Sequence, residues 1–198
     1  MVRGPWALKV FLWVGHPRAE SLSALMADAY EEGLRAEHDV RRLDLADMQF
    51  DPNLAEGYST VQPLEPALVA WQEHLKWCDH TVWFYPDWWG GMPAKMKGTL
   101  DRALLPGFGF RYHRRTPLWS KLLKGRTADI VITAGAPQIL DDLINGAPIQ
   151  KQVRNSVLDF VGIRTRAIIH LTAGRKPIPP RRLRKWQRRV AACAKSLG

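Results

Sequence analysis

The sequence predicts an α/β fold in which a parallel sheet of five strands is covered by helices on both faces. Five short apolar runs of strand length alternate along the chain with five longer stretches that have the helical period. Strands that alternate with helices are joined by crossovers, so they run parallel in one sheet. The 198 residues are 46% apolar and 24% charged, which is typical of a globular protein, and we expect one domain over residues 1–198.

The patterns place each element. Strands are predicted at residues 9–14, 39–43, 81–85, 128–133 and 166–171. Helices are predicted at residues 22–35, 64–77, 93–104, 149–160 and 180–196. This order is typical of the flavodoxin-like form of the doubly wound fold, which binds ligands at the carboxyl ends of its strands. Two long connections, residues 44–63 and 105–125, have a length that is usually associated with function.

The loop after the third predicted strand is the most distinctive part of the chain. Trp88 and Trp89 are followed there by Gly90 and Gly91. The glycines let backbone approach a flat ligand closely, and the two indoles offer stacking surfaces. The alternative is that both Trp side chains fill the core or a contact between subunits.

The loop after the first predicted strand indicates an anion site. Ser21 is a favourable N-cap, and the first turn of the helix that follows presents free N–H groups at the positive end of the helix dipole. A phosphate there would have His16, Arg18, Ser21 and Ser23 as further donors. The alternative is that Ser21 only caps the helix and His16 is a solvated loop residue. No G-x-G-x-x-G pattern follows this strand, and no P-loop pattern occurs in the chain.

The fourth predicted strand also ends in a loop of small residues, at positions 133–136. Because the carboxyl ends of parallel strands lie at one edge of a sheet, we expect the three loops to converge on one crevice. That crevice would have an anion-binding end and an aromatic end. Flavin mononucleotide (FMN) has a matching phosphate tail and flat ring, so the sequence predicts an FMN site.

Composition argues against several other classes of protein. No apolar run is long enough to span a bilayer, and the first strand begins too early to leave room for a signal peptide, so a cytoplasmic protein without membrane insertion is expected. Cys78 and Cys193 are too few for a disulfide framework. The six His residues are dispersed without an H-x-x-x-H pair, so no metal site is expected.

Basic charge is concentrated at the C-terminus. Residues 175–198 contain nine Lys or Arg and no Asp or Glu, whereas residues 1–174 contain 20 basic against 19 acidic residues. A helix there would bury a stripe made of Leu183, Trp186, Val190, Ala194 and Leu197. We interpret the arginines as a solvated face of this helix; a nucleic-acid or acidic-membrane patch is the alternative.

Taken together, the motifs resemble the NAD(P)H:quinone oxidoreductase family of flavodoxin-like enzymes over residues 9–173. The most specific of them is Met92-Pro-Ala-Lys-Met-Lys-Gly98, with Leu100-Asp-Arg102 and Gly107-Phe-Gly-Phe110 after it. The resemblance implies two-electron hydride transfer from NAD(P)H, through FMN or alternatively FAD, to a quinone or similar flat acceptor. It also implies a homodimer.

The resemblance assigns roles to residues as well. Including Arg18 from the anion loop, the residues expected to hold the flavin are His16, Arg18, Ser21, Leu22, Ser23, Gln72, Pro86, Asp87, Trp88, Trp89, Gly90, Thr133, Ala134, Gly135 and Ala136. The positions up to Gln72 would hold the ribityl and phosphate side, and the later ones would surround the isoalloxazine ring. Phe108, Gly109 and Phe110 would line the quinone and nicotinamide pocket across a homodimer interface. No side chain is expected to act as a nucleophile.

Two features depart from that family. Its members commonly have Gly-Gly after the fourth strand, followed by a Tyr and a His near the flavin, whereas residues 137–162 contain neither Tyr nor His. Asp87 would place a carboxylate beside an electron-rich reduced ring, so we expect this side chain to point to solvent.

Two rival functions belong to other classes. One is a flavin-binding regulatory subunit of a potassium-efflux transporter, which a steady-state reductase assay would distinguish from an enzyme. The other is a nucleic-acid-associated protein that uses the C-terminal arginines, and salt-dependent DNA binding would be its signature.

Overall fold

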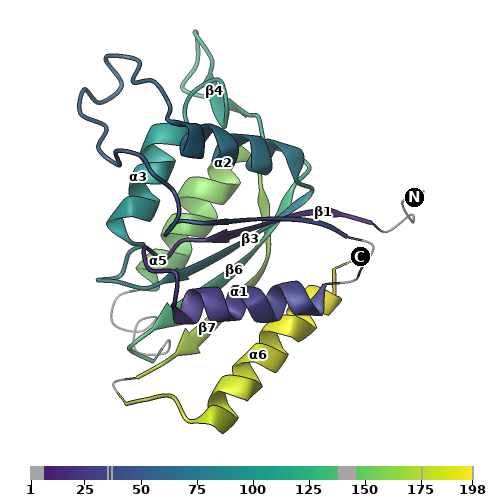
Figure 1. Ribbon diagram of the computed structural model, residues 1–198. Helices are drawn as coiled ribbons and strands as arrows, with labels where there is room; N and C mark the ends of the chain where they lie inside the picture. Colours follow the sequence, from purple (N-terminus) through teal and green to yellow (C-terminus); the bar gives the residue numbers. More distant parts are fainter. Residues whose placement is uncertain (1–6, 35, 37, 138–145, 175, 198) are drawn as a thin grey trace.

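The sheet has the strand order of a flavodoxin-like fold. The computed structural model describes residues 7–34, 36, 38–137, 146–174 and 176–197. Its five main strands are all parallel, in the order β2-β1-β3-β6-β7. Helices lie on both faces of this sheet (Figure 1). The predicted fold class is therefore confirmed.

The strands lie where the apolar runs predicted them. They are β1 (Lys9–Val14), β2 (Asp39–Asp44), β3 (His80–Pro86), β6 (Thr127–Ala134) and β7 (Arg164–Thr172). β1 has the predicted bounds, and the ends of the other four differ by one or two residues. Every residue of β3 is buried. A central parallel strand is covered on both faces, so its sequence is a continuous apolar run that is easily recognised.

The helices agree with the prediction except in one region. They are α1 (Leu22–Gly33), α2 (Pro66–Trp77), α3 (Ala94–Ala103), α5 (Pro148–Lys151) and α6 (Pro180–Lys195). The regular helix predicted at residues 149–160 is instead the short α5 followed by a π-helical segment, Gln152–Asp159. Val153 and Leu158 are both buried there, and their spacing of five residues matches the i→i+5 repeat of a π-helix rather than the α-helical period.

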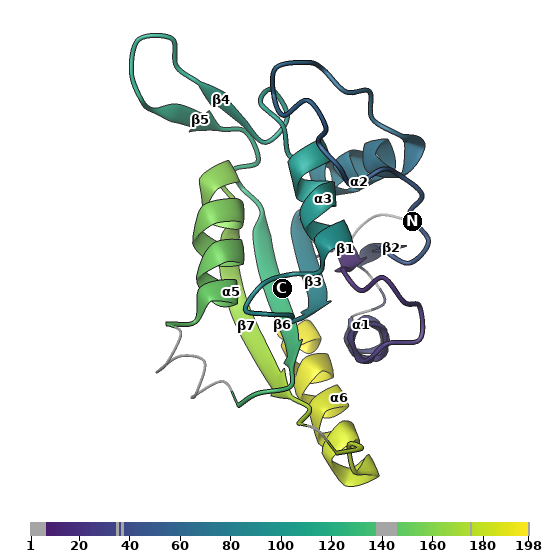
Figure 2. The same ribbon diagram turned by 90° about the vertical axis from the view of Figure 1, so that its left-hand side faces the viewer.

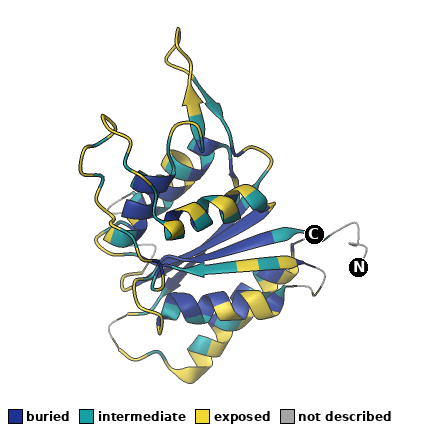
Figure 3. Cartoon of the chain, turned by 45° about the horizontal axis from the view of Figure 1, so that its top comes forward, coloured by how far each residue is buried: buried dark blue, intermediate teal, exposed yellow. Residues whose placement is uncertain are grey.

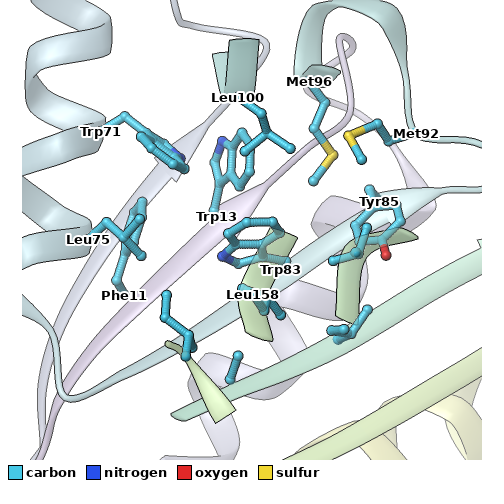
Figure 4. Close-up of a cluster of buried hydrophobic side chains, with 14 of the residues drawn as sticks. Phe11, Trp13, Trp71, Leu75, Trp83, Tyr85, Met92, Met96, Leu100 and Leu158 are labelled. Carbon is cyan, nitrogen blue, oxygen red and sulfur yellow. The ribbon is translucent and has the colours of Figure 1, made fainter. Parts of the chain in front are cut away.

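One face of the sheet packs on an aromatic core under α2, α3 and the π-helical segment. Trp13 lies edge-to-face against both Trp71 and Trp83, with ring centroids 5.1 and 4.9 Å apart. Figure 4 shows these rings together, with Tyr85 beside Met92. Three of the nine Trp residues are thus part of this core.

The other face carries α1 and α6 over a buried polar group, the Asp129 cluster, defined as Tyr30, His80, Asp129, Arg166 and Cys193. Asp129 is fully buried in β6 and accepts hydrogen bonds from the Tyr30 hydroxyl (2.8 Å) and the Arg166 guanidinium (2.9 Å from Nε). The Cys193 thiol donates to it from α6 (3.3 Å), and His80 Nε2 lies 3.6 Å away. Side chains from five elements or loops therefore meet at one carboxylate.

A hairpin occupies the long connection between residues 105 and 125. Its antiparallel strands are β4 (Phe110–Tyr112) and β5 (Trp119–Lys121). Residues 113–118 between them are exposed, as are Arg111 and Tyr112 of β4. This hairpin was not predicted, because strands of three residues are too short for a periodic pattern to identify them.

Candidate cofactor site

Three loops meet at the carboxyl edge of the sheet. They follow β1, β3 and β6, which are neighbours in the sheet order. The His16 and Trp88 rings join the first two loops edge-to-face, with centroids 5.4 Å apart. The Asp87 N–H donates to the Thr133 carbonyl (2.8 Å), and the Ser23 and Thr133 hydroxyls lie 3.4 Å apart. These contacts link each loop to the other two.

The loop after β1 leads directly into the start of α1. The Ser21 hydroxyl accepts from the Ala24 N–H (3.1 Å), so Ser21 is the N-cap, as predicted. Leu22 and Ser23 follow in the first turn, where no earlier helical carbonyl can accept from their N–H groups. Gly15 lies so close to α3 that a Cβ would come within 2.4 Å of the Met96 sulfur, so a larger residue there would displace the Met96 side chain. Arg18 is exposed beside this turn.

His16 is half-buried between the first loop and Trp88. Its Nδ1 accepts from the Arg18 N–H (3.0 Å), which leaves Nε2 to carry the proton of the neutral ring. Burial lowers the pKa of His16 from its ordinary value, and the charge of Arg18 lowers it further. The neutral ring is therefore favoured at pH 7, with Nε2–H as a hydrogen-bond donor.

The loop after β3 is a tight turn that exposes an indole. Trp88 and Gly91 exchange two backbone hydrogen bonds of 2.9 and 3.0 Å. The residues between them, Trp89 (φ 58°) and Gly90 (φ 72°), both have left-handed backbone. Glycine adopts this conformation freely, whereas a Trp is strained in it. Trp89 is nevertheless fully exposed and Trp88 about half exposed, so the turn presents aromatic surface at an energetic cost.

Asp87 does not point to solvent as expected. Its Oδ1 is buried and the residue as a whole is half-buried. The reason is the hydrogen bond from its N–H to Thr133, which fixes residue 87 between the ends of β3 and β6.

The loop after β6 begins buried and becomes exposed. Thr133 and Ala134 are buried, whereas Gly135 and Ala136 are exposed. The neighbouring start of α5 approaches the loop after β3, since a Cβ on Gly90 would lie 3.2 Å from the Pro148 side chain.

Gln72 is not brought to these loops. It lies within α2, and its side-chain N–H donates to the Ala103 carbonyl at the end of α3 (2.6 Å). Its side chain therefore joins two helices over the aromatic core, and the expected contact with the flavin tail is not supported by the geometry.

Phe108 and Gly109 follow α3 in the chain, and Phe110 begins β4, which lies beyond the end of α3 that is distant from the three loops (Figure 2). Gly109 is packed against Leu104 and Val161, where a Cβ would meet side-chain atoms at 2.9 and 3.0 Å. Phe110 contacts the Phe160 ring, with centroids 4.9 Å apart. Ten residues of helix, about 15 Å, separate these positions from the turn at Trp89.

A cavity of about 440 Å³ runs along α3 toward this hairpin. Its lining begins at Met92, beside the loop after β3, and ends at Phe110 and Tyr112. Lys97, Leu100, Asp101 and Leu104 supply the face of α3 that borders it. Phe110 was predicted from the sequence but this helix face was not, although its i, i+3, i+4, i+7 spacing was the available signal.

The three-loop edge fits a flat ligand with an anionic tail. The start of α1 supplies N–H groups and hydroxyls for an anion, and the turn after β3 supplies aromatic surface. Within the described ranges, no group of three metal-ligating side chains was found. No described helix is long and apolar enough to cross a membrane.

Comparison with known proteins agrees with this fold. A family model described as flavodoxin-like fold matches residues 9–192. A crystal structure from Streptococcus mutans UA159 superimposes with a TM-score of 0.79 at 25% identity, covering 94% of this chain and 98% of that one.

Curated relatives carry oxidoreductase names. A ribosyldihydronicotinamide dehydrogenase-like protein of Penicillium crustosum is 29% identical over 65% of this chain, and rat NAD(P)H dehydrogenase [quinone] 1 is 26% identical over 52%. The matches span 58% and 46%, respectively, of those relatives' lengths. An FMN-dependent NADH:quinone oxidoreductase of Ruegeria pomeroyi is 29% identical over 64% of this chain and 70% of its own length. These names confirm the resemblance that the motifs indicated.

Proposed function

The chain belongs to the flavodoxin-like fold family, and on that basis we propose that it is an FMN-dependent NAD(P)H:quinone oxidoreductase. When bound, FMN would supply the two-electron chemistry, taking a hydride from NAD(P)H and delivering it to a quinone or similar flat acceptor. The observation that carries this proposal is the meeting of the three loops through His16–Trp88, Ser23–Thr133 and Asp87–Thr133.

The first loop holds the phosphate in this proposal. The N–H groups of Leu22 and Ser23, the Ser21 and Ser23 hydroxyls and the Arg18 guanidinium are the donors. Ser21 also keeps its cap on Ala24, because a hydroxyl can accept one hydrogen bond and donate another. His16 donates from Nε2 toward the ribityl side.

The second and third loops hold the ring. Pro86 to Gly90 supply a wall that includes the Trp88 and Trp89 indoles, and the backbone of Asp87 fixes the register with β6. N–H groups in residues 133–136 serve as donors to the polar edge of the ring. They replace the Tyr and His that members of the resembling family commonly have there.

The acceptor pocket is completed in a homodimer. Trp89 is fully exposed in the single chain, and the cavity along α3 is open beside Phe110. A second subunit that placed Phe108 and Phe110 over the ring of the first would cover both features. It would also exclude water from the hydride-transfer site.

Stopped-flow spectroscopy tests the function in two half-reactions. Purified protein is loaded with FMN, and its released cofactor is identified to distinguish FMN from FAD. Under anaerobic conditions, NADH or NADPH should bleach the flavin absorbance, and a quinone added afterwards should restore it. Protein that binds FMN tightly but is neither bleached by NADH or NADPH nor reoxidised by quinone would contradict the proposed activity.

A further inference from the structure

α6 presents a uniformly cationic face to solvent. Its exposed side chains include Arg181, Arg182, Arg184, Lys185, Arg188, Arg189 and Lys195. At about 100° per residue these seven cations span about 160° of the helix circumference. Besides Pro180 at the helix start, Ala192 is the one other exposed residue of α6. Figure 3 shows α1 and α6 together along its lower edge, blue toward the sheet and yellow outside.

These cations are not neutralised by neighbouring carboxylates. Among the residues that the structure describes, none of the seven forms an ion pair. The facing helix α1 carries Asp28 and Glu31, but both pair with Arg42 of β2. Glu32 of α1 borders a hollow with Arg184 and Arg188 without pairing with either. The positive charge of α6 is therefore available to an outside partner.

Apolar packing fixes the orientation of this face. Trp186, Val190 and Ala194 are buried on the side of α6 that meets the sheet and α1. Arg182 donates to the Thr172 carbonyl and lies 4.8 Å above the Trp186 ring, and Arg189 is directed at the His170 carbonyl. Within the part of the chain that the structure describes, the other five cations make no side-chain hydrogen bond or ring contact, so packing does not require their charge.

We propose that the outer face of α6 docks the protein on an anionic lipid bilayer. Charge complementarity selects an anionic surface, and seven cations along one straight helix suit a planar one. The face has no exposed aromatic side chain, so it lacks the stacking platforms typical of proteins that bind single-stranded nucleic acid. The choice of a bilayer over nucleic acid rests on the proposed function. Apolar quinones dissolve in lipid, so an enzyme that reduces them would meet them at a bilayer surface.

The expected strength follows from the number of charges. Each Lys or Arg near an anionic bilayer strengthens binding about fivefold. Removal of four charges should therefore weaken binding more than 100-fold if they act independently. Salt should weaken it as well, because the Debye length falls to about 8 Å at physiological ionic strength.

The test compares two variants with the same net charge. The patch variant carries Arg181→Gln, Arg184→Gln, Lys185→Gln and Arg188→Gln, which leave Arg182 and Arg189 and their contacts intact. The control variant carries Lys76→Gln, Arg114→Gln, Arg115→Gln and Lys124→Gln, at exposed positions away from α6. Each loses four charges from the net charge of +10. Sedimentation with phosphatidylcholine vesicles, with and without 30% phosphatidylglycerol, measures binding of the full chain.

We expect wild type and control to bind the anionic vesicles, and the patch variant to lose at least tenfold more affinity than the control. Equal losses in the two variants, or equal binding to neutral vesicles, would overturn the proposal. So would tighter, patch-dependent binding to a 20-base-pair DNA duplex in the same buffer. Reduction of a water-soluble quinone should be unchanged in the patch variant, while reduction of a vesicle-embedded quinone should fall. Vesicle binding without any reductase activity would contradict the proposed function and leave the docking surface standing.

Discussion

The Asp129 cluster and the three-loop edge are two polar regions on the same sheet, and they differ in whether their polar groups are already paired with one another. In the cluster, Asp129 is fully buried and its neighbours donate to it. Burial raises the pKa of the Cys193 thiol, and Asp129 raises it further, to about 12, so this group stays a hydrogen-bond donor. At the edge, by contrast, Trp89 is exposed on strained backbone.

This difference indicates that the Asp129 cluster stabilises the fold and that the three-loop edge binds a ligand. Groups that satisfy one another are stabilising and have little capacity left for a ligand. Strained and exposed groups lower stability, and they persist where the surrounding structure holds them for another purpose. We therefore expect mutations in the cluster to change stability and mutations at the edge to change binding.

The largest effect is expected for Asp129→Asn. Removal of the buried charge leaves the Arg166 guanidinium without its carboxylate and should lower the free energy of unfolding by about 3 kcal/mol. Asp28→Asn breaks an exposed ion pair with Arg42 and should cost less than about 1 kcal/mol. Urea denaturation of both variants measures this contrast. If the Asp129→Asn protein were as stable as the Asp28→Asn protein, the claim that the Asp129 cluster stabilises the fold would be contradicted.

The pH dependence of the free energy of unfolding should also reveal the role of the Asp129 carboxylate. Burial alone would raise the pKa of Asp129, but interactions with His80, Arg166 and Tyr30 outweigh it and hold the pKa well below the ordinary value. A carboxyl with a depressed folded-state pKa stabilises the fold above its unfolded pKa of about 4, and this contribution is lost as pH falls below that value. Wild type should lose stability more steeply than Asp129→Asn as pH falls below 4. If the free energy of unfolding fell equally with pH in both proteins, the Asp129 carboxyl would not be the group responsible for the loss.

At the edge, Trp89→Gly should separate stability from activity. Glycine relieves the left-handed strain at φ 58° and should raise the free energy of unfolding by about 1 kcal/mol. Loss of the indole should lower kcat/KM for quinone about tenfold. Gly90→Ala in the same turn should instead destabilise, because its Cβ would be strained and would press on Pro148. A destabilised Trp89→Gly protein with full activity would place Trp89 among the structural residues.

A smaller effect is expected for Arg18→Ala combined with Ser21→Ala. Loss of the cap should cost about 1 kcal/mol of stability with or without ligand. Affinity for FMN should fall several-fold, while affinity for riboflavin, which lacks the phosphate, should change little. Calorimetric titration with both flavins makes the comparison. Equal weakening for FMN and riboflavin would show that these two residues do not recognise the phosphate.

The fold was predictable from the sequence because its strands are short apolar runs that local pattern reveals. The N-cap at Ser21 and the buried stripe of α6 were predictable for the same local reason, and both are confirmed. The partner of Gln72 lies 31 residues away in α3, and no local pattern indicates it. The burial of Asp87 depends on a hydrogen bond to β6, and the strain at Trp89 depends on the register of a turn. Both are consequences of tertiary contacts that composition and spacing do not encode.

The most direct test of the central claim is a calorimetric titration of FMN into the full chain. If the three loops form one flavin site, FMN should bind with a stoichiometry of one per chain and a micromolar or tighter Kd. The Asp129→Asn protein, where folded, should bind with the same affinity, because its substitution lies in the other polar region. Absence of FMN and FAD binding by folded wild-type protein at high micromolar concentrations would contradict the account.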